Sequence, residues 1–330
     1  MSANAPEPLL VVSELEVRFR LPGQREPLRA VDGVSFEIGA SEVFGLIGES
    51  GSGKSSVARA VLRLAPIAHG SVTLGGTRFD QLRGRELRRH RRRVQMVFQD
   101  PHESLDPRMT VREAVREPLR LGGGRDGVDD RALECIERVG LDSNLLDRRP
   151  NELSGGQKQR VNIARALALE PELLVCDEAV SALDVSVRAG IINLLLSLQQ
   201  DLGISILFIS HDLGVVAHLA DRIGVMYLGK LAEVAPAESL TTRPRHPYTE
   251  ALLAAEPEAR PSAYRTPRPP VIHGDAPSAA HPPAGCRFST RCPYVAERCR
   301  VEEPALRPVG PDALVACHFA EELQLAGRRG

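Results

Sequence analysis

The sequence predicts an α/β fold, with a mostly parallel sheet, an antiparallel β layer, a helical subdomain and a small C-terminal appendage. Two observations predict the sheet: apolar runs at residues 43–47, 173–176 and 204–209, and helical patterns between them. Apolar strands that alternate with helices are typical of parallel strands covered on both faces. A proline-rich, apolar-poor stretch from Pro236 to Pro311 predicts the appendage.

The elements at the start of the chain follow from hydrophobic periodicity. Residues 9–20 and 28–38 alternate apolar and polar side chains, which predicts half-exposed antiparallel strands. The apolar run 43–47 is followed by glycines and then by apolar residues at helical spacing over 55–64. This order predicts a strand, a glycine-rich loop and a helix.

The pattern changes in the middle of the chain. A short apolar strand over 94–98 is followed by helical patterning to about residue 169. Residues 187–202 then form an amphipathic helical stretch between two apolar strands. We therefore expect one domain over residues 1–235, with its helical subdomain at about 100–169, and a second domain over 236–330.

Composition excludes several classes of protein. The chain has 330 residues and a formal net charge of −1, whereas nucleic-acid binders usually carry a strong basic excess. The N-terminus lacks a basic region followed by an apolar run, and no stretch approaches the about 18 apolar residues of a membrane-spanning helix. We expect a soluble, cytoplasmic chain with no nucleic-acid partner.

The loop after the strand 43–47 reads GESGSGKS and begins at Gly48. Glycines at Gly48, Gly51 and Gly53 allow the backbone N–H groups to wrap closely around phosphates. Lys54 would reach the β- and γ-phosphates, and Ser55 would ligate Mg²⁺. The strand and helix on either side are the context that this phosphate-binding loop requires.

Polar side chains follow the other apolar strands. Asp177 and Glu178 come after the strand 173–176, at the edge where ligands bind in open α/β sheets. Asp177 would hold Mg²⁺, and Glu178 would polarise a water for in-line attack on phosphorus. His211 follows the strand 204–209 and would contact the γ-phosphate, while Gln99 follows 94–98 and would sense Mg²⁺ or the attacking water.

A second glycine-rich turn lies at LSGGQKQR, residues 153–160. Ser154 is a credible N-cap, and the glycines after it expose N–H groups at a helix start, which forms an anion site. An ordinary capped helix is the alternative. Because a phosphate loop lies upstream, we expect this turn to contact a nucleotide on another subunit.

These motifs together resemble an ABC-transporter ATPase subunit, over about residues 9–235. The resemblance rests on GESGSGKS, Gln99 in VFQDP, LSGGQKQR, LLVCDE, SALD and His211, in this order. It implies a P-loop NTPase fold of the ABC nucleotide-binding type, with ATP and Mg²⁺ as ligands. Ala179 stands where the family usually has proline, which puts the rate of turnover in question but removes no chemical group.

The same resemblance implies the residues of the nucleotide site. In a head-to-tail dimer the turn at Ser154 completes the partner's site, Asp184 links the two sites, and Phe19 stacks on adenine. Glu178, His211 and Gln99 are the implied catalytic residues, and Ser55, Gln99 and Asp177 the implied Mg²⁺ ligands. The full nucleotide-binding set is Phe19, Gly48, Glu49, Ser50, Gly51, Ser52, Gly53, Lys54, Ser55, Ser56, Gln99, Ser154, Gly155, Gly156, Gln157, Asp177 and Asp184.

A narrower resemblance is to the oligopeptide/dipeptide importer group. It rests on VFQDPHESLDPRMTV, SALDVS, HPYTEALL at residues 246–253 and GCRFSTRCP at 285–293, and HPPAGCRF looks most like the second of two paired ATPases. It implies a peripheral subunit on the cytoplasmic face of the membrane. Its partners would be two transmembrane permease subunits, a paralogous ATPase and an extracytoplasmic solute-binding protein. Importers of nickel or other small solutes share these features.

Four of the six cysteines lie in the C-terminal segment, at Cys286, Cys292, Cys299 and Cys317. Disulfides are rare in a reducing cytosol, and a metal centre would help an apolar-poor segment to fold. The spacing has no CxxC pair, which zinc sites usually show, whereas Fe–S clusters accept varied four-thiolate spacings. The resemblance also points to a [4Fe-4S] cluster; zinc and unligated thiols are the alternatives.

Two other classes of function compete with transport. A soluble ABC mechanoenzyme would carry long coiled coils, a zinc-hook insertion or two cassettes, and this chain has one cassette without heptad arrays. A redox-sensing adaptor would use its ATPase only secondarily. The sequence leaves open the transported solute and the choice between a homodimer and a heterodimer.

Overall fold

The computed structural model describes residues 7–20, 27–99, 104–122, 127–256 and 277–328. They form two compact units. The first unit contains the described residues that fall within 1–10, 38–43 and 73–209, and the second contains those within 11–37, 44–72 and 210–330. Each unit joins segments that are distant in the sequence, and each contains part of the expected domain 1–235.

The first unit contains three parallel strands. Strand β7 (Leu173–Asp177) pairs with β6 (Val94–Val97) on one side and with β8 (Ser205–Ser210) on the other. Every residue of β7 and β8 is buried, as expected for parallel strands covered on both faces. The register sets Asp177 opposite Ile209, so β7 and β8 end at the same edge.

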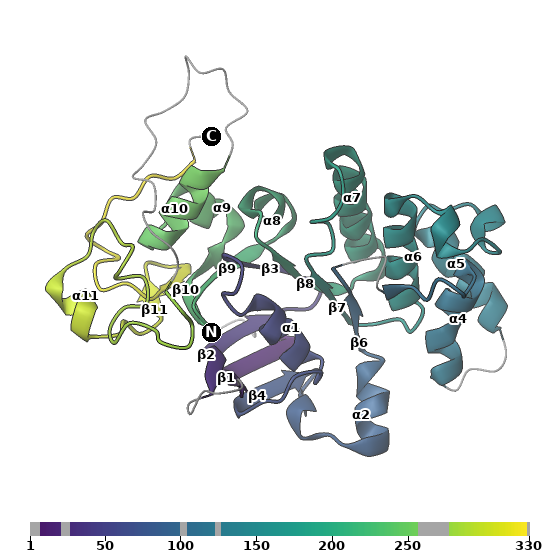
Figure 1. The fold of residues 1–330 in the computed structure, drawn as a ribbon, viewed down its shortest axis with the longest axis horizontal. Helices are drawn as coiled ribbons and strands as arrows, with labels where there is room; N and C mark the ends of the chain where they lie inside the picture. The colour runs from purple at the N-terminus through teal and green to yellow at the C-terminus, as the bar shows by residue number, and fades with distance from the viewer. Residues whose placement is uncertain (1–6, 21–26, 100–103, 123–126, 257–276, 329–330) are drawn as a thin grey trace, which may run out of the picture. The chain divides into compact units, whose positions relative to one another are not determined.

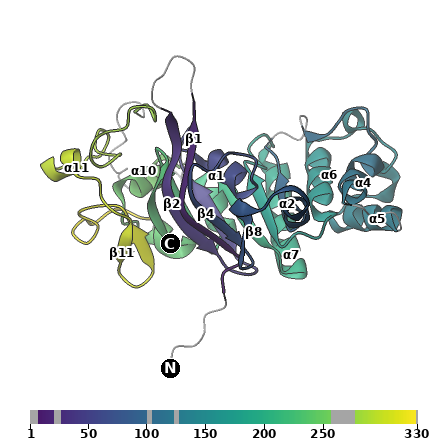
Figure 2. The same ribbon diagram turned by 90° about the horizontal axis from the view of Figure 1, so that it is seen from below.

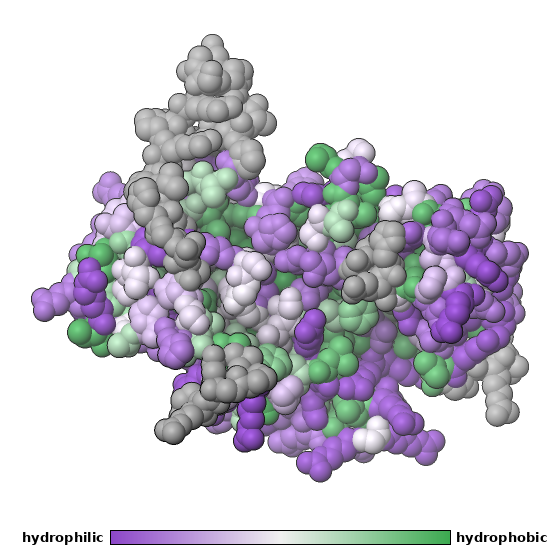
Figure 3. Space-filling model, in the orientation of Figure 1, coloured by the Kyte–Doolittle hydropathy of each residue, from purple (hydrophilic) through white to green (hydrophobic). Residues whose placement is uncertain are grey.

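Helices make up most of the rest of this unit. Helices α4 (Val111–Leu121), α5 (Val128–Arg138) and α6 (Gly155–Leu167) pack on one another, and α6 also contacts α7 (Val185–Leu202) (Figure 1). The surface over α4 and α5 is largely hydrophilic in Figure 3. The described residues between β6 and β7 contain helices and no strand, which agrees with the helical pattern of this stretch.

Smaller elements complete the first unit. Helix α2 (Gly84–Arg91) has no buried residue, and the short strand β5 (Thr77–Arg78) pairs with the end of β4 (His69–Leu74). Single turns of 3₁₀-helix occur at Phe79–Gln81, Ser143–Leu145 and Pro150–Glu152.

The second unit contains a mixed run of strands. Strand β3 (Val43–Ile47) pairs in parallel with β9 (Arg222–Tyr227), and β9 pairs antiparallel with β10 (Lys230–Pro236). Strand β10 continues antiparallel to β12 (Ala313–Val315), which pairs with β11 (Arg307–Val309). The C-terminal segment therefore adds its own strands to the edge of this sheet.

A second set of strands in this unit lies beside one another in Figure 2. Strands β1 (Leu10–Phe19) and β2 (Leu28–Ile38) are neighbours, and β1 also neighbours β4. Their burial alternates along the chain, as the sequence pattern predicts for a half-exposed layer.

The second unit also contains short helices. They are α1 (Lys54–Val61), α8 (Leu213–Leu219), α9 (Ala237–Thr242), α10 (Pro247–Ala255) and α11 (Glu297–Val301). Helices α9 and α10 contact β10. Among the described residues, no helix has the length and hydrophobicity needed to cross a membrane.

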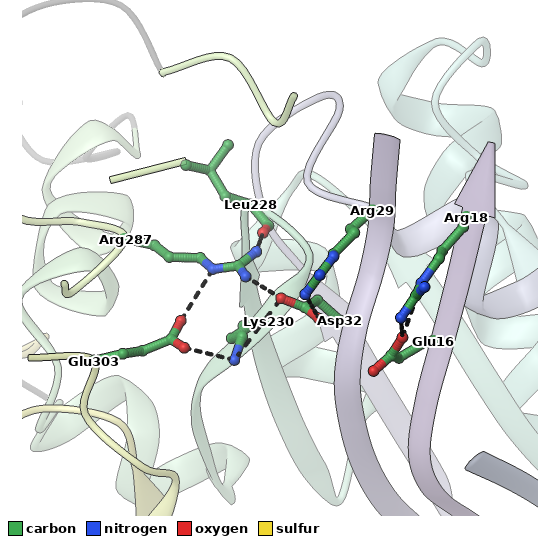
Figure 4. Close-up of polar contacts among 8 residues, drawn as sticks. All are labelled: Glu16, Arg18, Arg29, Asp32, Leu228, Lys230, Arg287 and Glu303. Carbon is green, nitrogen blue, oxygen red and sulfur yellow. Dashed lines mark hydrogen bonds and ion pairs between the residues drawn. The ribbon is translucent and has the colours of Figure 1, made fainter. Parts of the chain in front are cut away.

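A network of ion pairs attaches the C-terminal segment to the strands of the second unit (Figure 4). The Arg287 guanidinium donates to the Asp32 carboxylate of β2 and to the Leu228 carbonyl. Its Nε bonds to Glu303 at 3.2 Å, and Lys230 of β10 bonds to Glu303 at 2.9 Å. Arg287 and Asp32 are only 12% and 11% exposed, so the low dielectric strengthens their attraction.

Glu233 of β10 makes the stability of this unit depend on pH. Its side chain is fully buried and accepts N–H bonds from Arg245 at 2.9 Å and His246 at 3.0 Å, yet burial raises its pKa to about 7. A raised folded-state pKa favours the protonated carboxyl. Its contribution is therefore present below pH about 4.5, the unfolded value, and is lost as pH rises through about 7.

We expect Glu233→Gln to flatten the fall in unfolding free energy between pH 5 and 8 by up to about 3 kcal/mol. Urea denaturation across this range measures the slope, and Glu238→Gln, at an exposed position, is the matched control. An unchanged slope would contradict the assignment. Burial lowers the pKa of His246 to about 4, so its contribution has the opposite sign and declines as pH falls below about 6.5.

Candidate nucleotide-binding site

The phosphate loop joins β3 to α1 in the second unit. Gly48 and Gly53 have φ values of 154° and 107°, and a Cβ atom at either would lie about 2 Å from a carbonyl oxygen, of Met226 and Ala30 respectively. Only glycine fits such close backbone approaches. The loop is also fixed by the Gly229 N–H, which donates to the Ser52 carbonyl at 2.8 Å.

Lys54 begins α1 and is 4% exposed. Its ammonium donates to the carbonyl oxygens of Gly48 at 2.7 Å and Glu49 at 2.9 Å. The side chain thus folds back over its own loop, and its ammonium group lies beside the first two residues of that loop. A compact ammonium can bond there and to a phosphate together, which the planar fork of arginine would do less well.

The edge of the first unit's strands brings two predicted catalytic residues together. The Gln99 side-chain amide donates to the Glu178 carboxylate at 2.9 Å, although 79 residues separate them. Glu178 has a φ of 47°, a left-handed conformation that costs of order 1–3 kcal/mol for a residue with a side chain. Hydrogen bonds hold this conformation: the Glu178 N–H donates to Ile209, and Ser181 Oγ donates to the Glu178 carbonyl.

The neighbouring predicted residues differ in exposure. Asp177 is buried at the end of β7, whereas His211 is exposed directly after β8. Ala179 is buried, and its carbonyl accepts a 2.7 Å bond from Gln159 of α6. This bond fixes the turn after Glu178 at the position where proline would have restricted φ. Gln99, Asp177 and Glu178 belong to the first unit, and the phosphate loop and His211 to the second.

Helix α6 begins at the second glycine-rich turn as the sequence predicts. Ser154 Oγ accepts the Gln157 N–H at 3.3 Å, and Gln157 Oε1 accepts the Ser154 N–H at 2.9 Å, which forms a capping box. Ser154 and Gly155 are exposed. The first turn of this helix therefore presents backbone N–H groups and the positive end of its dipole at the surface.

The two glycines of this turn have different surroundings. A Cβ at Gly156 would lie 2.6 Å from Val187 Cγ1 of α7, whereas a Cβ at Gly155 would lie 3.8 Å from its nearest neighbour, in Leu183. We expect Gly156→Ala to destabilise the chain by about 1–3 kcal/mol through overpacking. Gly155→Ala is the matched control and should have little effect on urea denaturation. Equal effects of the two substitutions would contradict the packing assignment.

Asp184 and Phe19 occupy positions open to solvent. Asp184 caps α7, because its carboxylate accepts the Val187 N–H at 2.9 Å and the Ser186 hydroxyl at 2.8 Å, and these bonds lower its pKa. It is exposed at the helix start. Phe19 ends β1 half-buried, so part of its ring stays available for contact.

The four C-terminal cysteines line one small cavity of about 20 Å³, together with Phe288. Burial raises the pKa of Cys286 to about 11 and that of Cys292 to about 12. Among the described residues, no group of three or more His, Cys, Asp or Glu side chains has an arrangement that could hold a metal ion. The thiols thus share a cavity without forming a ready coordination shell.

Comparison with known proteins places these features in a family. The ABC transporter model matches residues 31–181, and the model of the C-terminal region of oligopeptide/dipeptide transporters matches residues 232–299. YkfD of Bacillus subtilis, named as an oligopeptide transport ATP-binding protein, is 46% identical over 94% of this chain and 95% of its own length. The chain belongs to the ABC transporter family.

Further similar proteins and solved structures support this family assignment. A peptide import ATP-binding protein of Brucella ovis is 48% identical over 94% of this chain and 97% of its own. Among solved structures, the ATP-binding cassette MJ0796, described as a dimer bound to ADP and Pi, aligns with a TM-score of 0.63 and 30% identity, covering 69% of this chain and 98% of its own. CbiO1 of Clostridium perfringens aligns with the same TM-score at 26% identity, covering 71% and 90%.

The family assignment confirms the expected ABC cassette fold and the expected activity. This chain is an ABC-type ATPase. Sequence reasoning named the residues of the phosphate loop and the strand edges but did not identify the contact between Gln99 and Glu178. It also gave no role to Tyr248, Arg287 or Arg291, whose partners lie far away in the sequence.

Proposed function

We propose that this ABC ATPase energises the import of peptides through a membrane permease, working on the cytoplasmic face of the membrane. The match of residues 232–299 to the C-terminal region of oligopeptide/dipeptide transporters carries the proposal. The relatives of Bacillus subtilis and Brucella ovis, named for oligopeptide and peptide transport, support it. The partners would be two transmembrane permease subunits, a paralogous ATPase subunit and an extracytoplasmic solute-binding protein.

The roles proposed for the site residues combine their chemistry with what membership of the ABC family implies. Residues Gly48 to Ser56 would hold the phosphates of ATP, with Lys54 at the β- and γ-phosphates and Phe19 against adenine. Ser55, Gln99 and Asp177 would hold Mg²⁺, which would neutralise charge on the phosphates. Glu178 would accept a proton from the attacking water, and His211 would contact the γ-phosphate.

The hydrogen bond from Gln99 has a role in this mechanism. Its amide bonds to the Glu178 carboxylate at 2.9 Å and would orient that carboxylate toward the attacking water. Ser154, Gly155, Gly156 and Gln157 would bind the γ-phosphate held by a second ATPase subunit, and Asp184 would link the two sites. Closure of the dimer on ATP would then drive the permease.

Reconstitution tests the proposed substrate class. The native complex, purified with its membrane subunits and inserted into lipid vesicles with the binding protein, should accumulate labelled short peptides when ATP is supplied. Uptake of nickel without peptide uptake would favour the related small-solute importers. If no integral membrane subunit co-purifies, the chain instead acts as a soluble ABC ATPase.

We also propose a metal centre on Cys286, Cys292, Cys299 and Cys317, with a [4Fe-4S] cluster as the first candidate and Zn²⁺ as the second. The shared cavity and the four sulfur donors support it. A cavity of about 20 Å³ is close to the space of one water molecule, so a cluster would require the thiols to move apart. The importer-type C-terminal domain would span residues 236–330 and would contain this cavity. Most of the family match at residues 232–299 lies within it.

Metal analysis of protein purified without oxygen distinguishes these cases. We expect wild type to contain iron and acid-labile sulfide, and Cys292→Ser to lose them. Cys135→Ser is the control, because Cys135 is buried in helix α5 of the other unit and should leave the metal content unchanged. Zinc in place of iron would select the second candidate, and a metal-free, colourless protein would refute the centre.

A further inference from the structure

We propose that Arg291 and Tyr248 are positioning residues for the phosphate loop, through which the C-terminal segment sets the affinity of this chain for nucleotide. Both residues act on Glu49, the second residue of the loop. The inference rests on the proposal that Gly48 to Ser56 bind nucleotide. It goes beyond that proposal because it assigns part of the nucleotide site to a segment outside the ATPase motifs.

The first contact is an ion pair. Arg291 Nη1 bonds to the Glu49 carboxylate at 2.8 Å and to the Tyr227 hydroxyl at 3.3 Å. The side chain of Arg291 is 9% exposed, that of Glu49 is 31% exposed, and the guanidinium also lies over the Tyr227 ring. A pair shielded from water and held by a second bond and a ring has a defined geometry, which exposed pairs lack.

The second contact holds the backbone of the same residue. The Glu49 N–H donates to the Tyr248 hydroxyl at 2.9 Å. Tyr248 lies in α10 and is fully buried, so its hydroxyl has one position. The C-terminal segment thus fixes both the side chain and the backbone of Glu49.

Arg291 itself is firmly attached. It lies in the segment from Cys286 to Cys292, here called the cysteine loop. Arg287 of this loop bonds to Asp32 and Glu303 (Figure 4), and Phe288 packs against Tyr227 and Tyr248 with ring centroids 5.3 and 5.4 Å apart. Two arginines and an aromatic ring therefore hold the cysteine loop against β2, β9 and α10.

The position of Glu49 matters because of its neighbours in the phosphate loop. Its carbonyl accepts a bond from Lys54 at 2.9 Å and another from the Ser52 N–H at 3.1 Å. A shift of Glu49 would therefore move both the lysine and the backbone that surround the phosphates. Binding sites tolerate displacements of only about 0.5 Å before affinity falls.

Nucleotide binding by the full-length chain tests the inference. The dissociation constant of a fluorescent ATP analogue is measured for wild type, Arg291→Ala, Arg291→Lys, Glu49→Gln, the double variant Arg291→Ala/Glu49→Gln, and Tyr248→Phe. Thermal unfolding is recorded for each protein. Arg298→Ala is the matched control, because Arg298 is exposed in the same segment and, among the described residues, forms its ion pair with the equally exposed Glu302.

We expect Arg291→Ala and Glu49→Gln each to weaken binding about tenfold, and the double variant to be no weaker than either. Arg291→Lys should recover part of the affinity, because it keeps the charge and loses the fork geometry. Tyr248→Phe keeps the ring and should also weaken binding, which preserves the test if Arg291→Ala fails to fold. Arg298→Ala should bind as wild type does.

The variant Lys54→Ala distinguishes failure of the positioning role from failure of the nucleotide-site assignment. If Lys54→Ala abolishes binding while Arg291→Ala and Tyr248→Phe bind as tightly as wild type, the positioning role is overturned and the nucleotide site stands. A lower melting temperature of Arg291→Ala with unchanged affinity also overturns it, because that result describes a purely structural contact. If Lys54→Ala binds normally, the nucleotide assignment itself fails.

Discussion

Replacement of Glu178 by glutamine is expected to lower ATP turnover by about 10²- to 10⁴-fold while ATP binding is retained. The amide keeps the size of the side chain and can still accept the bond from Gln99, but it cannot take a proton from water. The backbone conformation at φ 47° is also unchanged, because both residues carry the same Cβ. The substitution therefore removes chemistry and little structure.

Phosphate release measured on the assembled complex checks this expectation, with ATP binding measured on the same samples. Glu170→Gln is a closely matched control. Glu170 also has a left-handed backbone, with φ at 51°, and its exposed carboxylate pairs with Arg131. We expect this variant to turn over ATP as wild type does. Undiminished turnover in Glu178→Gln would contradict the assignment of Glu178 as the general base.

The sheet strands were predictable because burial on both faces requires apolar residues throughout. Residues 43–47 form β3 with the predicted bounds, and 173–176 and 204–209 match β7 and β8 to within a residue at each end. The phosphate loop was predictable for a related reason. Its glycines and lysine are neighbours in sequence, so the chemistry of the site is visible in one octapeptide.

The contacts of the C-terminal segment could not be predicted in the same way. Arg291 and Glu49 are 242 residues apart, and Arg287 and Asp32 are 255 apart. No periodicity connects such pairs. A proline-rich composition indicates a weak core, yet this segment is held by partly buried ion pairs and by strand β12, which pairs with β10 over two residues. Short strands, and ion pairs between residues far apart in the sequence, produce no hydrophobic periodicity that could be detected locally.

Exchange of subunits between two inactive variants should restore ATPase activity if the turn at Ser154 serves a partner's nucleotide. Lys54→Ala damages the phosphate loop, and Gly155→Asp places a carboxylate where the γ-phosphate of the partner would bind. The nearest atom to a Cβ at Gly155 is 3.8 Å away, and an acidic residue in the first turn of a helix favours its dipole, so this variant should fold. Each variant alone should be inactive.

In a head-to-tail dimer of one Lys54→Ala chain and one Gly155→Asp chain, the intact phosphate loop of the Gly155→Asp chain faces the intact turn of the Lys54→Ala chain. One complete site forms, and an equal mixture of the variants should regain activity in the roughly half of its dimers that are mixed. If the turn serves the nucleotide of its own chain, every site carries one defect and the mixture stays inactive. Because the proposed partner in the complex is a paralogous ATPase, ATP-dependent dimerisation of the wild-type chain with itself is first established by sedimentation. The double variant Lys54→Ala/Gly155→Asp mixed with Lys54→Ala is the negative control, because no dimer in that mixture has an intact phosphate loop.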